Sequence, residues 1–358
     1  MRRLIPLALA GLAVAGAGSA AVTGTANAAT AHGPQLAGAA LPSHVFAPYF
    51  EAWDTSAGTL AQQSAASGAK YLTLAFLQTD QSGSCQAYWN GSTATPISAT
   101  AAGSFGADIA AIQAAGGNVI PSFGGYTADT TNTELADSCT DVHAIAAVYE
   151  SLITTYHAPR IDLDIEATSL SDTAGIVRRN QAIAETEQWA ARHGRHIEFS
   201  YTLPTFPTGL PSAELAVLRD AVTEHATISV VNIMTFDYYL GTTEDMLADA
   251  DSAATAVHGQ LAALYPREQS RALWGKIGIT QMPGIDDFGP AETFPVAAAP
   301  AQLHWAISKG IGELSFWALQ RDNGGCPGTQ GAGSCSGVTQ PTWYFSHVFE
   351  PFSYLGRR

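Results

Sequence analysis

The chain has 358 residues, of which 46% are hydrophobic and only 13% carry a charge. This length and composition suit one large domain with a single core better than two small domains. The formal net charge of −15 disfavours nucleic acid and anionic membrane surfaces as partners. We therefore expect a neutral ligand that is bound by aromatic rings and hydrogen bonds.

The N-terminus has the features of an export signal. Met1-Arg2-Arg3 precedes an apolar run over residues 4–17, and Ala26-Asn27-Ala28 offers a small-residue cleavage site. A membrane anchor is the alternative, but the apolar run is short and rich in Gly and Ala. We predict a signal peptide over residues 1–28 and a secreted, extracellular protein. Residues 29–43 are Ala/Gly/Pro-rich and are predicted to be a disordered lead-in.

From residue 44 onward, apolar runs of strand length alternate with segments of helical period. The predicted strands are 44–50, 70–77, 117–123, 160–165, 196–203, 227–234, 273–280 and 312–319. The predicted helices are 59–66, 107–115, 143–155, 174–193, 213–224, 245–264 and 300–309. This alternation predicts an α/β fold, a single (β/α)8 TIM barrel over residues 44–352. An open doubly wound sheet is the alternative, but no Gly-rich phosphate turn follows the first strand.

The fourth predicted strand carries three carboxylates, Asp162, Asp164 and Glu166, in strict alternation with apolar residues. Alternation places the three acids on one face of the strand, about 6 to 7 Å apart. Like charges at this spacing cannot all be ionised, so at least one proton is retained at neutral pH, as a general acid requires. A hydrated edge strand and a calcium or magnesium site are alternatives that the row alone leaves open.

A barrel also ranks these acids by depth, because catalytic groups lie at the carboxyl ends of its strands. Glu166 is the last residue of the strand pattern and should stand at the mouth. Asp164 should lie one layer below it, and Asp162 deeper still. Since solvation is poorest at the bottom, we expect Asp162 to keep a proton most readily, Asp164 to share it and Glu166 to act on the substrate.

Other strand ends carry residues suited to binding a ligand. Paired glycines allow close backbone approach, and a Trp ring can stack on a sugar. The candidates are Gly124 and Gly125 after the third strand, Met234, Asp237 and Tyr238 after the sixth, Gln281 after the seventh and Trp317 in the eighth. Trp53, Tyr126 and Trp305 are weaker candidates, as packing residues or distal sugar platforms.

The four cysteines indicate an oxidising compartment and two disulfide bonds. Cys326 and Cys335 share one Gly-rich loop and form the simplest pair. Cys85 and Cys139 are then left to bridge two other loops. A metal site is the alternative, which the spacing does not favour.

Taken together, these residues resemble family 18 glycoside hydrolases, the chitinase family, over nearly all of residues 44–352. The stretch from Ile161 to Glu166 resembles the family's D-x-D-x-E signature, and Ser122-x-Gly124-Gly125 resembles its S-x-G-G signature. Met234-Thr235-Phe236-Asp237 resembles the M-x-Y-D element, and Trp317 resembles the Trp under the scissile sugar. Further likeness to the bacterial chitinase D-like branch comes from Leu203-Pro204, Asn232-Ile233-Met234, Gly278-Ile279-Thr280, Ser315-Phe316-Trp317 and Arg321-Asp322.

The resemblance implies retaining hydrolysis of chitin or another N-acetylglucosamine polymer with help from the substrate, an exception to the two-carboxylate scheme. Glu166 would protonate the glycosidic oxygen, and the sugar's acetamido oxygen would attack the anomeric carbon. Asp164 would stabilise the oxazolinium ion, and Asp162 would hold Asp164. The expected partner is chitin or an N-acetylglucosamine oligosaccharide, with no cofactor and no metal, and we expect a monomer.

The chain departs from the family pattern at Phe236, which stands where M-x-Y-D has Tyr. The phenol that would hydrogen-bond the acetamido carbonyl is therefore absent at that position. Tyr238 is two residues further on and can share a face with Phe236 if the strand continues. We therefore expect Tyr238 to supply the phenol.

The sequence leaves three rival functions to be weighed. A glycan-binding barrel without turnover would be marked by loss of the strand-four Glu, which is present as Glu166. An endo-β-N-acetylglucosaminidase that acts on N-glycans would use the same machinery in a differently shaped cleft. A metal-dependent hydrolase would need His ligands, and none of the 10 His lies beside these carboxylates in the sequence.

Overall fold

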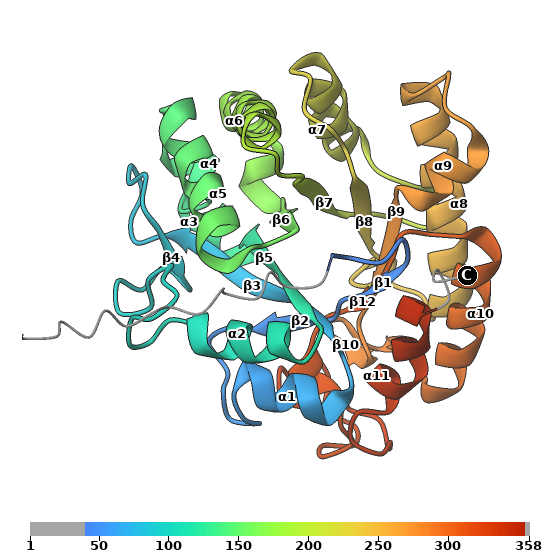
Figure 1. The fold of residues 1–358 in the computed structure, drawn as a ribbon. Helices are drawn as coiled ribbons and strands as arrows, with labels where there is room; N and C mark the ends of the chain where they lie inside the picture. Colours follow the sequence, from blue (N-terminus) through green and yellow to red (C-terminus); the bar gives the residue numbers. More distant parts are fainter. Residues whose placement is uncertain (1–39, 355–358) are drawn as a thin grey trace, which may run out of the picture. The chain divides into compact units, whose positions relative to one another are not determined.

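The computed structural model describes residues 40–354, and within them eight parallel strand segments form one sheet (Figure 1). Each segment falls within or overlaps one of the eight predicted strands. In chain order they are β1 (Val45–Phe46) with β2 (Tyr49–Glu51), β3 (Tyr71–Thr79), β5 (Asn118–Gly124), β6 (Arg160–Asp164), β7 (Glu198–Pro204), β8 (Val230–Met234), β9 (Ile277–Gln281) and β12 (Glu313–Phe316).

The sheet closes through its first segment, because β1 pairs with β12 and β2 pairs with β3. The backbone N–H of Ala47 donates to the carbonyl of Leu314 over 3.0 Å. One residue later, the carbonyl of Pro48 accepts from the N–H of Thr73 over 3.0 Å. The first and last strands of the ring therefore share one stretch of chain. The prediction of a (β/α)8 barrel is confirmed.

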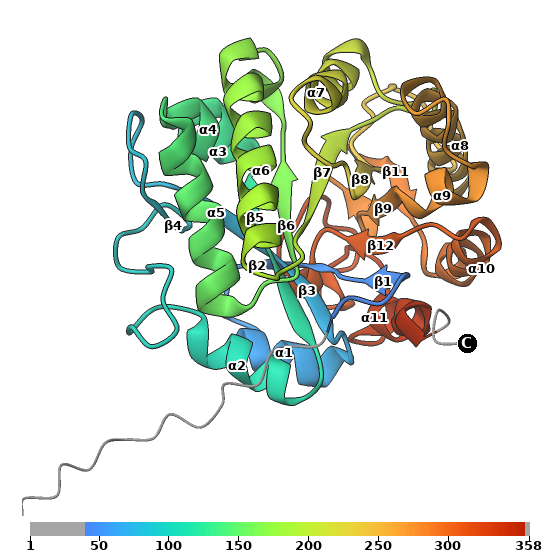
Figure 2. The same ribbon diagram turned by 45° about the horizontal axis from the view of Figure 1, so that its top comes forward.

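Helices follow the strands and pack around the sheet, and Figure 2 shows α5 through α10 succeeding one another around it. All seven predicted helices are present, and α11 completes the eighth unit. Their ends carry the expected caps, such as the Thr59–Gln62 capping box of α1 and Gly68 in the left-handed region after it. The helices are α1 (Leu60–Ser67), α2 (Gly106–Ala114), α5 (Val142–Tyr156), α6 (Thr173–Arg192), α7 (Ser212–Thr223), α8 (Met246–Leu264), α10 (Ala299–Lys309) and α11 (Tyr344–Phe349).

Short strands, helices and 3-10 turns that were not predicted lie at the mouth of the barrel and in the connections between its strands and helices. The predicted strand 273–280 begins instead as a helix, α9, and the strand starts only at Ile277. The additional strands are β4 (Ala87–Trp89), β10 (Gly284–Asp286) and β11 (Gly289–Phe294). The additional helices are α3 (Tyr126–Thr131), α4 (Leu135–Ser138), α9 (Ser270–Gly275) and the 3-10 turns η1 (Ala167–Leu170), η2 (Val296–Ala298), η3 (Leu319–Arg321) and η4 (Glu350–Tyr354).

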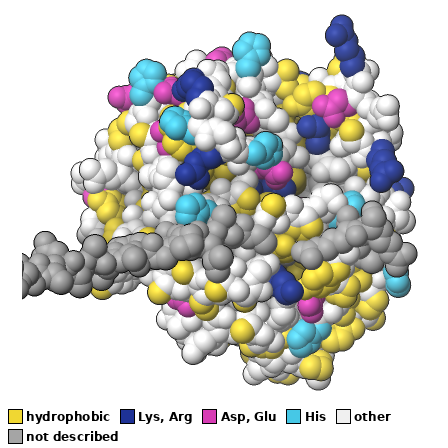
Figure 3. Space-filling model, viewed as in Figure 1, with side chains coloured by type: hydrophobic (Ala, Val, Ile, Leu, Met, Phe, Trp, Pro, Cys, Tyr) yellow, Lys and Arg dark blue, Asp and Glu magenta, His cyan; other side chains and the backbone are white. Residues whose placement is uncertain are grey.

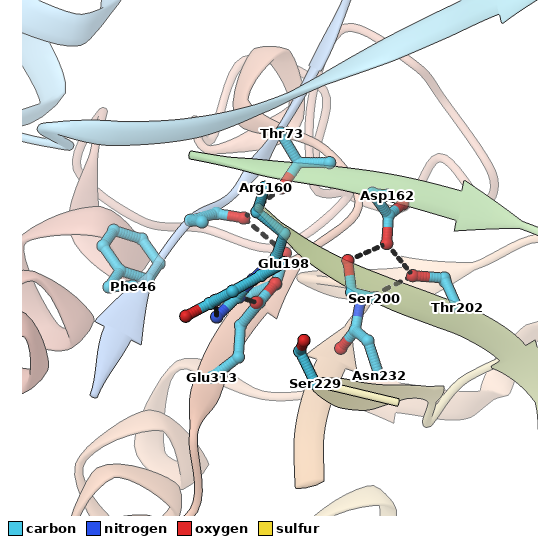
Figure 4. A network of polar contacts seen from close by, with 12 residues as sticks. Phe46, Thr73, Arg160, Asp162, Glu198, Ser200, Thr202, Ser229, Asn232 and Glu313 are labelled. Atoms are coloured by element: carbon cyan, nitrogen blue, oxygen red, sulfur yellow. Dashed lines mark hydrogen bonds and ion pairs between the residues drawn. The ribbon is translucent and has the colours of Figure 1, made fainter. Parts of the chain in front are cut away.

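The apolar core lies between the sheet and the helices, whereas much of the inside of the ring is polar. Ile161, Leu163 and Ile165 all belong to the large apolar cluster under the helices. At one end of the ring Arg160 contacts Glu198 and Glu313, each with an N–O distance of 2.6 Å (Figure 4). The alternation in β6 therefore sends its apolar side chains outward and its charged ones inward.

Both expected disulfide bonds are present. Cys85 bonds to Cys139 with their Cα atoms 4.7 Å apart, and Cys326 bonds to Cys335 at 6.0 Å. The first joins the β3–β4 connection to the end of α4. The second closes the loop between η3 and α11.

The predicted signal peptide and most of the predicted lead-in lie outside the described residues. Among residues 40–354, no helix combines the length and apolar character needed to cross a bilayer. On the face shown in Figure 3, acidic and basic side chains are interspersed among uncharged ones.

Candidate active site

The row of three acids points into the ring in the depth order expected from the sequence. Asp162 and Asp164 are only 2% and 4% exposed, and Glu166, just beyond the end of β6, is half-buried. Glu166 keeps an extended backbone, with φ −131° and ψ −178°, so the alternation continues past the last hydrogen-bonded residue. Asp164 and Glu166 line a cavity of about 670 Å³, and Asp162 lies behind them.

Asp162 is held by four hydroxyl groups. Its Oδ2 accepts from Tyr49 (2.9 Å) and Ser122 (2.7 Å), and its Oδ1 accepts from Ser200 (2.6 Å) and Thr202 (2.9 Å). Figure 4 shows the two contacts from β7. Burial raises the pKa of Asp162, but all four hydrogen bonds act in the opposite direction. A carboxyl with four O–H donors is best satisfied as a carboxylate.

Asp164 has the opposite environment. Its Oδ1 has no hydrogen-bond partner among the described residues. Burial, followed by the charges of Glu166 and Asp162, raises its pKa well above the usual value. Asp164 is therefore the acid that retains a proton, and the expectation that Asp162 would do so is corrected. The reason is that hydrogen-bond donors, which depth alone does not reveal, stabilise the charge of the deeper acid.

Glu166 combines access to the cavity with a raised pKa. Burial raises the pKa of its carboxyl to about 7, and a backbone hydrogen bond from Tyr126 partly opposes this shift. A carboxyl with this pKa is partly protonated at neutral pH and can both give and take a proton.

Beside the acids, four aromatic side chains form one wall of the cavity. The rings of Trp317 and Phe76 stack with centroids 5.5 Å apart and an interplanar angle of 12°. Tyr49 and Trp53 also contact Trp317, at 5.6 and 6.1 Å between centroids. All four line the cavity, so Trp317 lies where the sequence placed a sugar platform.

The paired glycines at the end of β5 allow close contacts around the acids. A Cβ atom on Gly124 would lie 2.0 Å from the carbonyl oxygen of Asp164, and one on Gly125 would lie 2.4 Å from the ring of Phe76. Both glycines have positive φ, and the N–H of Gly125 donates to the Asp164 carbonyl over 3.0 Å. Only residues without a side chain fit between β6 and the aromatic wall.

The last residue of β8 and the residues that follow it divide between the cavity and the core. Met234, Phe236 and Asp237 line the cavity, and burial raises the pKa of Asp237 to about 7. Tyr238 does not line it; its ring is 2% exposed and belongs to the apolar core. Asp237 has φ +52°, which turns the chain and ends the alternation on which the Tyr238 prediction depended. The expected phenol is therefore not on the cavity wall after β8.

Gln281 also lies away from the cavity. Its side chain donates to Gln302 of α10 over 3.0 Å and shares the helix-facing side of β9 with Ile279. Thr280, one residue earlier, faces the cavity instead. Among the weaker candidates, Trp53 and Tyr126 line the cavity, whereas Trp305 packs against Trp274 on the helix layer.

Several cavity residues were not anticipated. Tyr49 and Thr202 could have been found, because alternation in their strands points them inward. Phe76 and Gln78 lie in β3, whose register shifts between Leu74 and Leu77, so simple alternation does not place them. The others come from loops and added elements, which leave no periodic signal. These are Asn90, Thr127, Ala128, Asp287 and Phe288.

Comparison with known proteins agrees with this geometry. The sequence profile of the glycosyl hydrolases family 18 matches residues 45–278. The chain belongs to this family. That assignment covers β1 through the start of β9, including the acid row and the paired glycines.

Two curated relatives and one solved structure are similar to this family 18 chain. It is 30% identical over 88% of its length to a probable bifunctional chitinase/lysozyme of Escherichia coli (strain K12), and 28% identical over 79% to Endochitinase 11 of Metarhizium anisopliae. These matches span 35% and 53% of the two relatives' own lengths.

The solved structure comprises catalytic site mutants of active domain 2 of a thermostable chitinase from Pyrococcus furiosus, complexed with chito-oligosaccharides. It is 28% identical, with a TM-score of 0.76 over 91% of this chain and 99% of that one. The finer assignment to the chitinase D-like branch stays a prediction.

Proposed function

We propose that this chain is a secreted chitinase that hydrolyses β-1,4-linked N-acetylglucosamine polymers with retention of the anomeric configuration. The observation that carries the proposal is the pair Asp164 and Glu166, the first buried and the second half-buried. Both carboxyls have raised pKa values, and both are inward residues at one side of a cavity walled by Trp317. The three similar proteins named above all have chitinase in their names, which supports chitin as the substrate. Export is proposed on the signal-like residues 1–28.

In this mechanism Glu166 is the general acid and then the general base. Its carboxyl proton passes to the glycosidic oxygen as the bond from that oxygen to the anomeric carbon breaks. The acetamido oxygen of the same sugar forms a new bond to the anomeric carbon and gives an oxazolinium ion. The Glu166 carboxylate then takes a proton from the water that opens this ion.

Asp164 and Asp162 act on the charge of that intermediate. Asp164, between the sugar and Asp162, passes its proton to the Asp162 carboxylate, accepts a hydrogen bond from the acetamido N–H and stabilises the positive ring. The four hydroxyls around Asp162 keep a negative charge in the layer below, which favours a proton on Asp164 before the reaction. The indole of Trp317 offers a face on which the sugar can stack.

The proposal is tested by comparing wild type with Glu166→Gln on N-acetylglucosamine oligosaccharides. Wild type should release short oligomers whose first-formed product is the β-anomer. The amide cannot donate an acidic proton, so Glu166→Gln should lose about 10² to 10⁴-fold in kcat while it still binds the oligosaccharide. Equal rates in the two proteins, or initial release of the α-anomer, would contradict the mechanism. Activity on N-glycoproteins without activity on these oligosaccharides would show that the substrate is an N-glycan and not chitin.

A further inference from the structure

A fourth acid, Asp129, lies beneath the loop that carries Glu166. It belongs to α3 and is 1% exposed. The side-chain Oδ2 of Asp129 accepts a hydrogen bond from the backbone N–H of Glu166. The backbone carbonyl of Asp129 accepts one from the hydroxyl of Thr168. The residue between these two contacts, Ala167, has φ +41°, which non-glycine residues rarely adopt. Asp129 therefore holds both ends of a strained turn that begins at Glu166.

The same turn is tied to a buried cluster of charges. Ser169 donates to Asp137, and Asp137 and Glu134 both contact Arg179 of α6, at 3.3 and 2.6 Å. The Arg179 side chain is fully buried. Helices α3, α4 and α6 thus converge on residues 166–169 through polar contacts whose acidic and basic side chains are buried.

A contribution to stability does not explain why a buried acid occupies position 129. Its Oδ1 is buried and has no hydrogen-bond partner among the described residues, which costs free energy. Burial and the nearby Glu134 raise the pKa of Asp129 to about 9, against the effects of the Glu166 N–H and Arg179. At neutral pH it is therefore a neutral acid, and its side-chain oxygen serves as the acceptor for the peptide of Glu166.

We infer that Asp129 is a positioning residue that fixes the backbone of Glu166, so that the general acid projects into the cavity. This inference rests on the proposed function, because it assigns Asp129 a part in the same reaction. Asp129 does not line the cavity, so it should leave substrate binding largely unchanged and act on kcat.

The test compares Asp129→Ala with Asp129→Asn on N-acetylglucosamine oligosaccharides. Asp129→Ala removes the acceptor and should lower kcat by about 10 to 100-fold with little change in KM. Asp129→Asn keeps a neutral acceptor of the same shape and should stay within about threefold of wild type. Asp322→Ala is the matched control, since Asp322 is equally buried and accepts N–H groups of α11 instead. It should lower Tm without changing the kcat of the folded enzyme.

A double variant distinguishes positioning from general loosening of the fold. If Asp129 acts through Glu166, Asp129→Ala should cost almost nothing further in a Glu166→Gln background. Additive losses in the double variant, or an Asp129→Ala enzyme with wild-type kcat, would overturn the inference.

A spectroscopic readout keeps this test separate from the proposed function. In protein labelled with ¹⁵N-glutamate, the chemical shift of the Glu166 amide proton reports its hydrogen bond to the Asp129 carboxyl. Asp129→Ala should move it upfield, and Asp129→Asn should largely preserve it. An unmoved resonance in Asp129→Ala would overturn the inference even if wild type is active. Failure of wild type to hydrolyse the oligosaccharides would instead refute the proposed function.

Discussion

At the scale of single residues, one strand holds acids of very different character because their neighbours differ. Asp162 and Asp164 are almost equally buried, yet four hydroxyls surround the first and no donor from residues 40–354 reaches Oδ1 of the second. The difference favours a negative charge on Asp162 and a proton on Asp164 before the substrate reacts. Glu166, nearer to solvent, has a pKa of about 7.

This pKa predicts the alkaline limb of the pH profile. Glu166 must be protonated to act as the acid, so kcat/KM should fall about tenfold per pH unit above pH 7. Initial rates on a soluble oligosaccharide between pH 5 and 9 would measure it. A rate that stays constant up to pH 9 would show that Glu166 is not the titrating acid.

The limits of prediction from sequence also appear at single residues. Alternation correctly placed Asp162 and Asp164, because both lie in the regular strand β6. Tyr238 was misplaced because Asp237 adopts φ +52°, a turn that no periodic pattern announces. Gln281 was misplaced because the alternation of β9 was not applied to it. It is two residues from Ile279, so both side chains lie on the face of the strand that contacts the helices.

At the scale of elements, the eight strands and seven helices were predictable because repeated apolar periods specify them. The short elements between strand and helix were not. Helices α3 and α4 and the β10–β11 hairpin contain too few residues to show a period, yet they supply Asp129, Asp137 and Asp286 around the site. Sequence patterns therefore identified the barrel and the acid row but not the parts that hold Glu166 in place.

The close packing of β5 against β6 predicts that a side chain at position 124 would be harmful. Gly124→Ala would place a Cβ atom 2.0 Å from the Asp164 carbonyl, so the two strands must separate. We expect at least a tenfold loss of kcat and about 1 to 3 kcal/mol lower stability than the matched control. That control is Gly116→Ala, which has a similar φ of +82° but nothing within 4 Å of the new Cβ atom among the described residues.

Denaturant titration and oligosaccharide assays of both variants would measure these effects. Gly116→Ala carries the backbone strain alone, so it should remain fully active. Equal losses in the two variants would show that strain, and not the contact with Asp164, is responsible.

At the scale of the whole molecule, burial raises the pKa of carboxyls well beyond the acid row. Asp129 reaches about 9, Asp286 and Glu313 about 8, and Glu51 about 7. Between pH 4.5 and 9 the folded state therefore binds more protons than the unfolded state, whose carboxyls titrate near their usual values. Stability falls with rising pH wherever this holds.

We accordingly expect Tm to be highest near pH 5 and to decrease by several degrees toward pH 9. The net charge of −15 acts in the same direction, because acid relieves its self-repulsion. Thermal scans at fixed ionic strength would measure the trend, and Asp129→Asn should flatten it between pH 7 and 9. A Tm that is constant or rises toward pH 9 would contradict the assigned protonation states.

The central claim is that the substrate's own acetamido group attacks the anomeric carbon while Glu166 supplies the proton. The most direct measurement compares two oligosaccharides of equal length, one fully N-acetylated and one with glucosamine at the sugar whose bond is cut. We predict that the bond after glucosamine is cleaved at least about 10³-fold more slowly, because its free amine cannot form the oxazolinium ion. Similar cleavage rates for the two would contradict the account and would point to a protein carboxylate, such as Asp237 on the cavity wall, as the nucleophile.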